Sequence, residues 1–256
     1  MPVTQVPVDA GSRTPSGRTM AHIVTTRFES LLVDPAARSD ALDAAVEDHD
    51  PTGVVVTHHH PDHVGAVASY AEREGMTVWA RAGRAGAFET ATGIAPDRLF
   101  QPGGTLPAGV QVVDTPGHAP EHVAFVTDDG WLTGDLAVAT GSVVVGAPEG
   151  DMRAYLSSLR RVYARDPERL LPAHGPVIEE PRAVCERLLA HRLDREAHVL
   201  DAVRAGHERI PAIVEAAYEK DIADVFALAE ATVRAHIEKL AAERKLSWDG
   251  DRARPH

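Results

Sequence analysis

Residues 54–65, "VVVTHHHPDHVG", place four histidines and one aspartate within six consecutive positions, directly after an apolar β-branched run. The stretch "TGVVVT" is typical of a strand that is covered on both faces. His58 and His60 are two positions apart, and side chains at i and i+2 of an extended segment point to the same side, so both imidazoles can bind one ion. Asp62 and His63 follow where the chain turns into a helix, which directs them toward a second point. Neutral imidazole and carboxylate are ligands for Zn²⁺ and related metals, so this loop predicts a metal site.

The composition narrows the class of protein. The chain has 256 residues, of which 44% are hydrophobic and 25% are charged, as is ordinary for a globular protein with a real core. Its single cysteine excludes an internal disulfide and a cysteine zinc cluster. The net charge of −12 should repel polyanions, which disfavours a nucleic-acid partner. No stretch is long and apolar enough for a signal peptide or a membrane span, so we expect a soluble, cytoplasmic protein with no membrane partner.

The order of predicted elements indicates an α/β (α+β) chain with two domains. Up to about residue 180, strands dominate and three predicted helices lie between them; after Pro181 nearly all of the chain is predicted to be helical. We therefore predict a domain over 1–180 and a smaller appendage over 181–256. The predicted strands lie at 22–26, 29–34, 52–57, 76–80, within 109–118 and 169–175, and in a hairpin over 121–135. The predicted helices lie at about 39–48, 63–75, 151–165, 182–205, 211–219 and 226–244.

Four separated motifs resemble one family. "THHHPDH" (57–63) matches the H-x-H-x-D-H signature of the metallo-β-lactamase superfamily, and "DTPGH" (114–118), "LTGD" (132–135) and "LPAHG" (171–175) resemble the later metal motifs of that family, in its order. The resemblance spans about residues 29 to 178. It implies a four-layered αββα sandwich in which the metal ligands lie on loops at one edge, where two sheets meet.

The same resemblance implies a complete ligand set for two Zn²⁺ ions per chain, with iron or manganese as alternatives. His58, His60 and His118 would hold one metal, and Asp62, His63 and His174 would hold the second. Asp135 would bridge the two ions, and Asp62 and Asp135 are the predicted catalytic residues. A metal-bridging hydroxide would then attack a polarised carbonyl or phosphoryl group. The net charge of such a site is roughly +1, which suits a small and possibly anionic substrate.

Details of the motifs narrow the branch of the family. The bridging Asp135 resembles the hydrolase branches, whereas true β-lactamases lack that carboxylate. His60 stands where flavodiiron oxygen reductases usually carry glutamate, which disfavours an O₂-reducing di-iron site. The C-terminal stretches "HRLDREAHVLDAV" and "ATVRAHIEKLAAERKL" resemble the helical, winged-helix-like appendage of the β-lactamase-like-protein-2 branch, whose core is like that of glyoxalase II. Some members of that branch are reported as single-strand endoribonucleases.

Other residues with metal-binding chemistry are expected to have structural roles. His59 should point away from its two neighbours, and His122 and Asp114 should support the ligands rather than bind metal. Cys185 is expected to be a small buried hydrophobic residue. The histidines of the appendage have no metal-like spacing; they are His191, His198, His207 and His236.

The function predicted from these features is that of a dinuclear zinc-dependent hydrolase acting on a small ester, thioester or lactone. A single-strand-specific endoribonuclease is the main alternative, although residues 211–256 hold nine acidic and only seven basic residues and no basic stripe. A mononuclear iron sulfur dioxygenase is another alternative, because those enzymes share much of the motif. A non-catalytic scaffold is the fourth hypothesis, and the full ligand set argues against it. A homodimer is left open.

Overall fold

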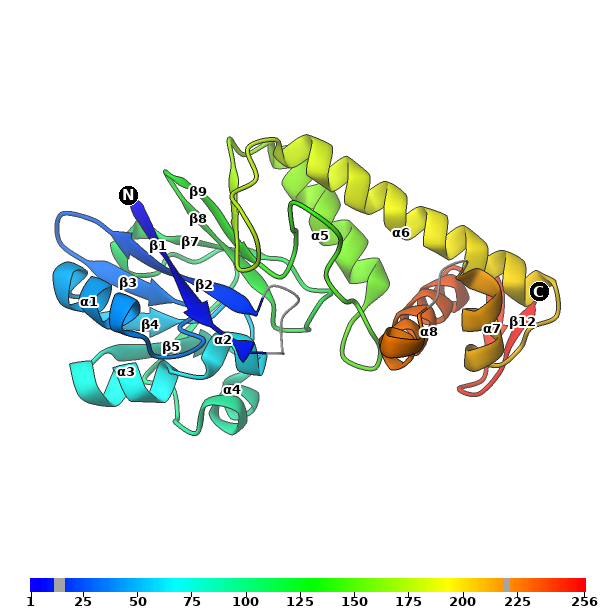
Figure 1. Ribbon diagram of the computed structural model, residues 1–256, viewed down its shortest axis with the longest axis horizontal. Helices are drawn as coiled ribbons and strands as arrows, with labels where there is room; N and C mark the ends of the chain where they lie inside the picture. Colours follow the sequence, from blue (N-terminus) through cyan, green and yellow to red (C-terminus); the bar gives the residue numbers. More distant parts are fainter. Residues whose placement is uncertain (12–16, 219–221) are drawn as a thin grey trace. The chain divides into compact units, whose positions relative to one another are not determined.

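The computed structural model describes residues 1–11, 17–218 and 222–256, and contacts divide them into two compact units. Unit 1 comprises Met1–Thr115, Glu121–Gly141 and Asp166–Pro181, and unit 2 comprises Pro116–Pro120, Ser142–Arg165 and Arg182–His256. The segment over 142–165, which was predicted within the domain over 1–180, therefore groups with the C-terminal helices. Each unit is described by itself (Figure 1).

The first sheet of unit 1 has its strands in sequence order. The strands β1 to β3 are antiparallel neighbours, and β3 to β6 are parallel. Because parallel strands end at the same edge of a sheet, the loops that follow β3 and β4 lie next to each other. The strands are β1 (Val3–Asp9), β2 (Arg18–Thr25), β3 (Ser30–Val33), β4 (Gly53–Val55), β5 (Thr77–Arg81) and β6 (Arg98–Phe100).

The second sheet of unit 1 has the order β10-β9-β8-β7. Its strands β7, β8 and β9 are antiparallel neighbours, while β10 pairs with β9 in parallel. The turn between β8 and β9 lies at Asp128-Asp129, as the hairpin signal predicted. The ends of β9 and β10 therefore meet at one edge. The strands are β7 (Gln111–Asp114), β8 (Val123–Thr127), β9 (Gly130–Gly134) and β10 (Leu170–Pro172).

Strand alternation divides the apolar side chains of unit 1 between two cores. On β4, Val54 packs in the core that also contains residues of α1 and α3, whereas Val55 packs in the core that the two sheets share. Successive side chains of a strand point to opposite faces, so a strand that contributes to both cores must be apolar throughout. This confirms the prediction that the strand before the histidines is covered on both faces.

The helices of unit 1 are short, and the predicted helix over 63–75 is two helices. Gly65 ends α2, and a Cβ at that position would lie only 2.3 Å from the carbonyl oxygen of Ala36, so the chain approaches this loop closely. The break separates α2, which carries two predicted ligands, from α3. In Figure 1 α1 and α3 lie near the first sheet. The helices are α1 (Asp40–His49), α2 (Pro61–Val64), α3 (Val67–Glu74), α4 (Ala85–Thr92) and the 3₁₀ turn η2 (Pro107–Gly109).

Unit 2 is mainly helical and has a core of its own. Val199 and Val203 of α6 pack in it with Val233 and Ile237 of α8. A two-stranded antiparallel sheet follows α8; the winged-helix-like character of this region stays a prediction. The last residue of the predicted helix over 211–219 lies outside the described residues. The elements are α5 (Met152–Arg165), α6 (Pro181–Arg204), α7 (Ile210–Ala217), η3 (Ala223–Val225), α8 (Phe226–Ala242), β11 (Leu246–Trp248) and β12 (Ala253–Pro255).

The structure confirms the α/β class and adds elements that the sequence pattern did not predict: β1, α4, β6, β11 and β12. Among the described residues, no helix combines the length and the apolar character that crossing a membrane requires.

Candidate metal centre

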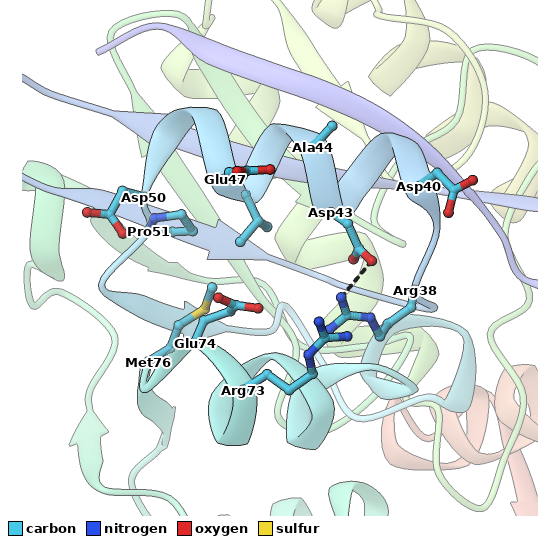
Figure 2. Close-up of a pocket in the computed structure, with 11 residues that line it drawn as sticks. Arg38, Asp40, Asp43, Ala44, Glu47, Asp50, Pro51, Arg73, Glu74 and Met76 are labelled. Atoms are coloured by element: carbon cyan, nitrogen blue, oxygen red, sulfur yellow. Dashed lines mark ion pairs between the residues drawn. The ribbon is translucent and has the colours of Figure 1, made fainter.

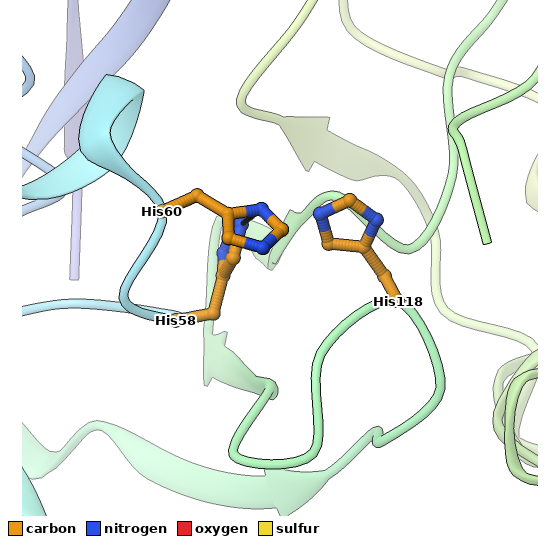
Figure 3. A group of neighbouring side chains, drawn as sticks. All are labelled: His58, His60 and His118. Carbon is orange, nitrogen blue, oxygen red and sulfur yellow. Dashed lines mark hydrogen bonds between the residues drawn. The ribbon is translucent and has the colours of Figure 1, made fainter. Parts of the chain in front are cut away.

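The loop after β4 brings the first predicted ligands together. His58 is fully buried, and its Nε2 lies 3.1 Å from Nδ1 of His60, as expected for side chains two positions apart. The two rings meet edge to face with centroids 4.5 Å apart, and in Figure 3 the His58 ring lies behind that of His60. Asp62 and His63 lie in α2. The turn into this helix was expected to direct both away from that pair, but the ring of His63 stays beside His58, with centroids 4.0 Å apart, so the two predicted half-sites adjoin at His58 and His63.

The ends of β9 and β10 supply two more side chains to this edge of unit 1. Asp135 follows β9, and its Oδ1 lies 3.3 Å from Nε2 of His63 and 3.2 Å from Nε2 of His174. His174 follows β10, and its Nε2 lies 3.4 Å from Oδ2 of Asp62. Within the described part of unit 1, two groups of three have all ligand atoms within 4.8 Å of one another: His58, His63 and Asp135, and Asp62, His63 and His174.

These spacings fit a metal better than a set of hydrogen bonds. In a tetrahedral site with metal–ligand bonds of about 2.0–2.2 Å, two ligand atoms stand about 3.4 Å apart. The separations that join Asp135, His174, His63 and Asp62 are 3.2–3.4 Å, apart from 4.0 Å between His63 and Asp62. Imidazole and carboxylate are also the donor types that zinc, iron and manganese accept. The residues present therefore fit bound divalent metal.

The electrostatics of this edge favour positive charge. Burial lowers the pKa of His63, but the carboxylates of Asp34 and Asp135 outweigh it and raise that pKa well above its ordinary value. In the same way, burial opposes but Asp135 and Asp62 raise the pKa of His174 to about 9. Although burial raises the pKa of Asp135, His63 and His174 lower it well below its usual range. Protons hold these groups together without metal, and a divalent cation can replace them.

Hydrogen bonds fix which nitrogen of each ligand histidine carries the proton. Asp34 accepts from the backbone N–H and the hydroxyl of Thr57, both at 2.7 Å. Since that hydroxyl proton goes to Asp34, the Thr57 oxygen accepts the proton of Nδ1 of His58, 3.1 Å away. Nδ1 of His63 donates to the same carboxylate over 3.0 Å. In both imidazoles Nε2 is therefore the nitrogen available to metal, and in His63 a bound metal would take the place of the proton that the nearby carboxylates favour.

The N-terminal end of β2 supports the remaining ligands. Nδ1 of His174 lies 3.1 Å from the carbonyl oxygen of Arg18, which can only accept, so Nδ1 donates there and Nε2, which faces Asp62 and Asp135, is the nitrogen available to metal. The hydroxyl of Thr19 donates to the carbonyl oxygen of Asp62 over 2.8 Å. These contacts hold α2 and the loop after β10 at one edge.

His122 supports the ligands and belongs to neither group of ligand atoms, as the sequence predicted. Its Nε2 accepts from the backbone N–H of Asp135 over 3.1 Å, so its Nδ1 carries the proton and donates to the hydroxyl of Thr115. Gly134 makes this approach possible: its φ is +47°, and a Cβ there would lie 2.5 Å from the Thr57 hydroxyl and 2.9 Å from Nε2 of His122. His122 thereby positions Asp135.

His59 and Asp114 point into supporting contacts. The ring of His59 packs edge-on against Phe88 with centroids 5.5 Å apart, and its backbone N–H donates to the buried carboxylate of Glu121. His59 therefore lies outside both ligand groups, as expected for the residue between two ligands. Asp114 forms an ion pair of 2.8 Å with Arg81, which also donates to the carbonyl oxygen of Glu121.

His118, which Figure 3 also draws, lies on the segment Pro116–Pro120 of unit 2. Within that unit its Nδ1 lies 2.6 Å from the carbonyl oxygen of Val144. Because a carbonyl only accepts, Nδ1 carries the proton and Nε2 keeps a lone pair. The role of His118 as a metal ligand stays a prediction from the resemblance.

The sequence prediction did not include Asp34, Thr57 or Arg81. Asp34 stands at the end of β3 with a φ of +51°, in the left-handed region that non-glycine residues seldom adopt. The signal in the sequence was "LLVDP", an apolar strand that ends in a carboxylate beside the strand of the histidine loop. The roles of Thr57 and Arg81 depend on contacts that a single sequence does not reveal.

A separate cavity of about 600 Å³ lies along α1 and the C-terminal part of α3 (Figure 2). An ion pair of 2.6 Å between Arg38 and Asp43 borders it, and Tyr70 donates to the same carboxylate. None of the predicted metal ligands lines this cavity. It does not contribute to the candidate metal centre.

Comparisons with known proteins agree with the metal motifs. The family model of the metallo-beta-lactamase superfamily matches residues 15–174. A beta-lactamase-like protein 2 homolog of Drosophila melanogaster is 32% identical over 208 residues, which cover 75% of this chain and 69% of that protein. A hydroxyacylglutathione hydrolase of Acidiphilium cryptum is 30% identical over 224 residues, which cover 82% of this chain and 81% of that protein.

Solved structures extend the comparison to the fold. A metallo-beta-lactamase family protein from Thermus thermophilus aligns over 99% of this chain and 98% of its own, with a TM-score of 0.77 and 22% identity, so the two share a fold that includes the C-terminal helices. A protein solved in a di-iron-bound form is 31% identical, covers 68% of this chain and 94% of its own, and has a TM-score of 0.57.

Proposed function

The chain belongs to the metallo-β-lactamase superfamily, and from this premise we propose that it is a dinuclear zinc-dependent hydrolase of a small ester, thioester or lactone. One observation carries the proposal: lone pairs of His58, His63 and His174 and two carboxylates converge at one edge, with the other nitrogen of each ring engaged. A structural cluster would need no such arrangement of acceptors.

The proposed ligand assignment follows the resemblance and the geometry together. His58, His60 and His118 would hold one ion, and the other ion would be held by Asp62, His63 and His174. Asp135 would contact both, which is consistent with its distances to His63 and His174 on one side and with its place in a group of close ligand atoms that includes His58. When bound, two divalent ions supply an acidified water nucleophile and polarise the oxygen of the substrate.

Residues of the chain orient the proposed ligands and supply the negative charge that the metals require. Asp34 orients two imidazoles: it accepts directly from Nδ1 of His63, and it orients Nδ1 of His58 through the hydroxyl of Thr57. These ligands are therefore oriented before substrate binds. Asp135 and Asp62 have lowered pKa values, although burial opposes the shift in both; both are therefore ionised at neutral pH and can accept positive charge. His122 fixes the backbone of Asp135.

Two of the relatives support alternatives to a zinc-dependent hydrolase of small substrates. The Drosophila relative supports a ribonuclease of the β-lactamase-like-protein-2 type as the second function, whereas the net charge of −12 opposes a polyanionic substrate. The relative in a di-iron-bound form supports iron as the alternative metal of a dinuclear site, whereas the mononuclear iron dioxygenase hypothesis requires a single metal per chain. The hydroxyacylglutathione hydrolase favours a thioester.

The test is an activity panel on zinc-loaded protein with a hydroxyacyl thioester, a lactone and a labelled single-stranded RNA. We expect thioester or lactone hydrolysis to fall at least about 100-fold in Asp135→Asn, since even partners behind metal ligands cost roughly 10–100-fold. The matched control is Asp128→Asn in the exposed turn of the same hairpin, which should keep full activity. RNA cleavage that is lost in Asp62→Ala would support the nuclease instead, and activity unchanged in Asp135→Asn would refute the hydrolase.

A further inference from the structure

Arg192 of α6 is a buried guanidinium, only 4% exposed, that the proposed chemistry does not use. Its Nη2 donates to the carbonyl oxygen of Val143, and its guanidinium carbon lies 5.5 Å from the centre of the Tyr155 ring. Burying a charged group costs free energy unless hydrogen bonds and contacts compensate for it. The contacts of Arg192 therefore indicate what the charge is retained for.

The first contact lies in a segment without helix or strand, residues 142–147, which we term the strap. The carbonyl of Val144, one peptide beyond the carbonyl that Arg192 binds, accepts the Nδ1 proton of His118 over 2.6 Å. Since no strand ladder fixes this segment, its carbonyls depend on other donors for their direction. By binding Val143, Arg192 restricts the peptide plane next to the one that orients His118.

The second contact of Arg192 is with the ring of Tyr155 in α5, and α5 also supports the loop of His118. The carbonyl of Gly117 accepts from the backbone N–H of Asp151 over 2.8 Å, and the carbonyl of Pro116 accepts from the hydroxyl of Ser158 over 2.8 Å. A Cβ at Gly117 would lie 2.3 Å from Cα of Tyr155, so the loop lies directly on α5 at that residue. Tyr155 is also the residue whose ring Arg192 covers.

We propose that Arg192 is a positioning residue for His118: it holds the strap and Tyr155, and through them the tautomer and direction of that imidazole. The helical unit would then set the geometry of one metal ligand. This inference rests on the proposed function, in which His118 binds one of the two metals.

The experiment compares Arg192→Met with Arg195→Met. Arg195 is a matched control on the same helix, because its guanidinium also donates to a backbone carbonyl, that of Ala217, and lies 3.6 Å from the centre of the Tyr218 ring. Zinc affinity is measured by competition with a chelator, and Co²⁺ spectra report the ligand geometry. We expect Arg192→Met to weaken one of two metals by roughly 10–100-fold, as for other partners behind ligands. Arg195→Met should bind both like the wild type, and Arg192→Lys should restore part of the affinity.

Equal affinities in Arg192→Met and the wild type, or equal losses in both methionine variants, would overturn the inference. A separate readout needs no metal: ¹⁵N spectra of the metal-free protein should show His118 as the Nδ1–H tautomer in the wild type and as a mixture of tautomers in Arg192→Met. If the wild type binds no metal, the proposed function fails, whereas an unchanged tautomer in Arg192→Met contradicts the positioning role alone.

Discussion

Two buried clusters of ionisable side chains differ in where their lone pairs point. At the metal edge, which comprises Asp34, His58, Asp62, His63, Asp135 and His174, imidazole and carboxylate lone pairs converge. In the α6–α8 cluster, which comprises Glu196, His236 and Lys239, the carboxylate of Glu196 already accepts from Lys239 over 2.8 Å. The exposed Lys245, which follows α8, lies 3.6 Å from the same carboxylate.

The pKa shifts show the same contrast. Burial raises the pKa of Glu196, but His236 and Lys239 outweigh it and lower that pKa to about 2. Burial lowers the pKa of His236, which stays neutral beside them. Among the residues that the structure describes, no group of three close ligand atoms includes Glu196 or His236. In the α6–α8 cluster Lys239 already compensates the buried carboxylate of Glu196, so the charge of this cluster needs no metal.

The largest expected effect separates three histidines. His58→Ala should lose one of two metals, because it removes a ligand, whereas His59→Ala should keep both because that ring packs on Phe88. His236→Ala, in the other cluster, should also keep both. Elemental analysis of zinc-loaded variants measures the stoichiometry, and equal loss in all three variants would contradict the distinction between the clusters.

A smaller effect is expected from the carboxylate behind the ligands. Asp34→Asn should weaken metal binding by roughly 10–100-fold, because an amide cannot accept from Thr57 and His63 as the carboxylate does. Glu196→Gln is the matched control in the α6–α8 cluster. Chelator competition should show wild-type affinity in that control. Equal weakening of metal binding by both substitutions would contradict the claim that Asp34, unlike Glu196, supports metal ligands.

The smallest effect is on the stability of the metal-free protein. The pKa of His174 is raised to about 9, so its contribution is fully present below about pH 6.5 and is lost as the pH rises through 9, by roughly 3 kcal/mol at most. Glu196 has a lowered pKa, so its contribution is present above about pH 4.5 and is lost only as the pH falls through about 2.

Urea unfolding of the metal-free protein at pH 6, 7.5 and 9.5 measures the alkaline loss, which should be smaller in His174→Gln. Added zinc should also reduce it, because bound ligands no longer need protons. A free energy of unfolding that stays level from pH 6 to 9.5 without metal would show that the protonated metal edge does not stabilise the chain.

Much of this site could be predicted because its spacing is local. The interval from His58 to His60 fixes a common side of an extended segment, and His63 follows in a short helix. Local spacing could not predict the role of Asp34. This residue follows β3, and it lies beside the histidine loop after β4 only because the two strands pair in the sheet. His122 was predicted as a support, but its partner, the backbone of Asp135, depends on the close approach at Gly134.

The fold was predictable where hydrophobic patterns were strong. The apolar run of β4 and the amphipathic α5 were identified, whereas the three-residue β6 carries too little pattern. The predicted helix over 63–75 was wrong after Gly65, where the backbone N–H of Ala66 donates to the carbonyl oxygen of Pro35 instead of continuing the helix. Such contacts join segments distant in the sequence, so local propensity does not reveal them.

The most direct test of the central claim is the metal content of the purified wild-type chain after loading with zinc, together with anomalous scattering at the zinc edge. We expect two zinc ions per chain, one beside His58 and His60 and one beside His63 and His174, with Asp135 in contact with both. A chain that binds no metal, or a single iron at full activity, would contradict the claim.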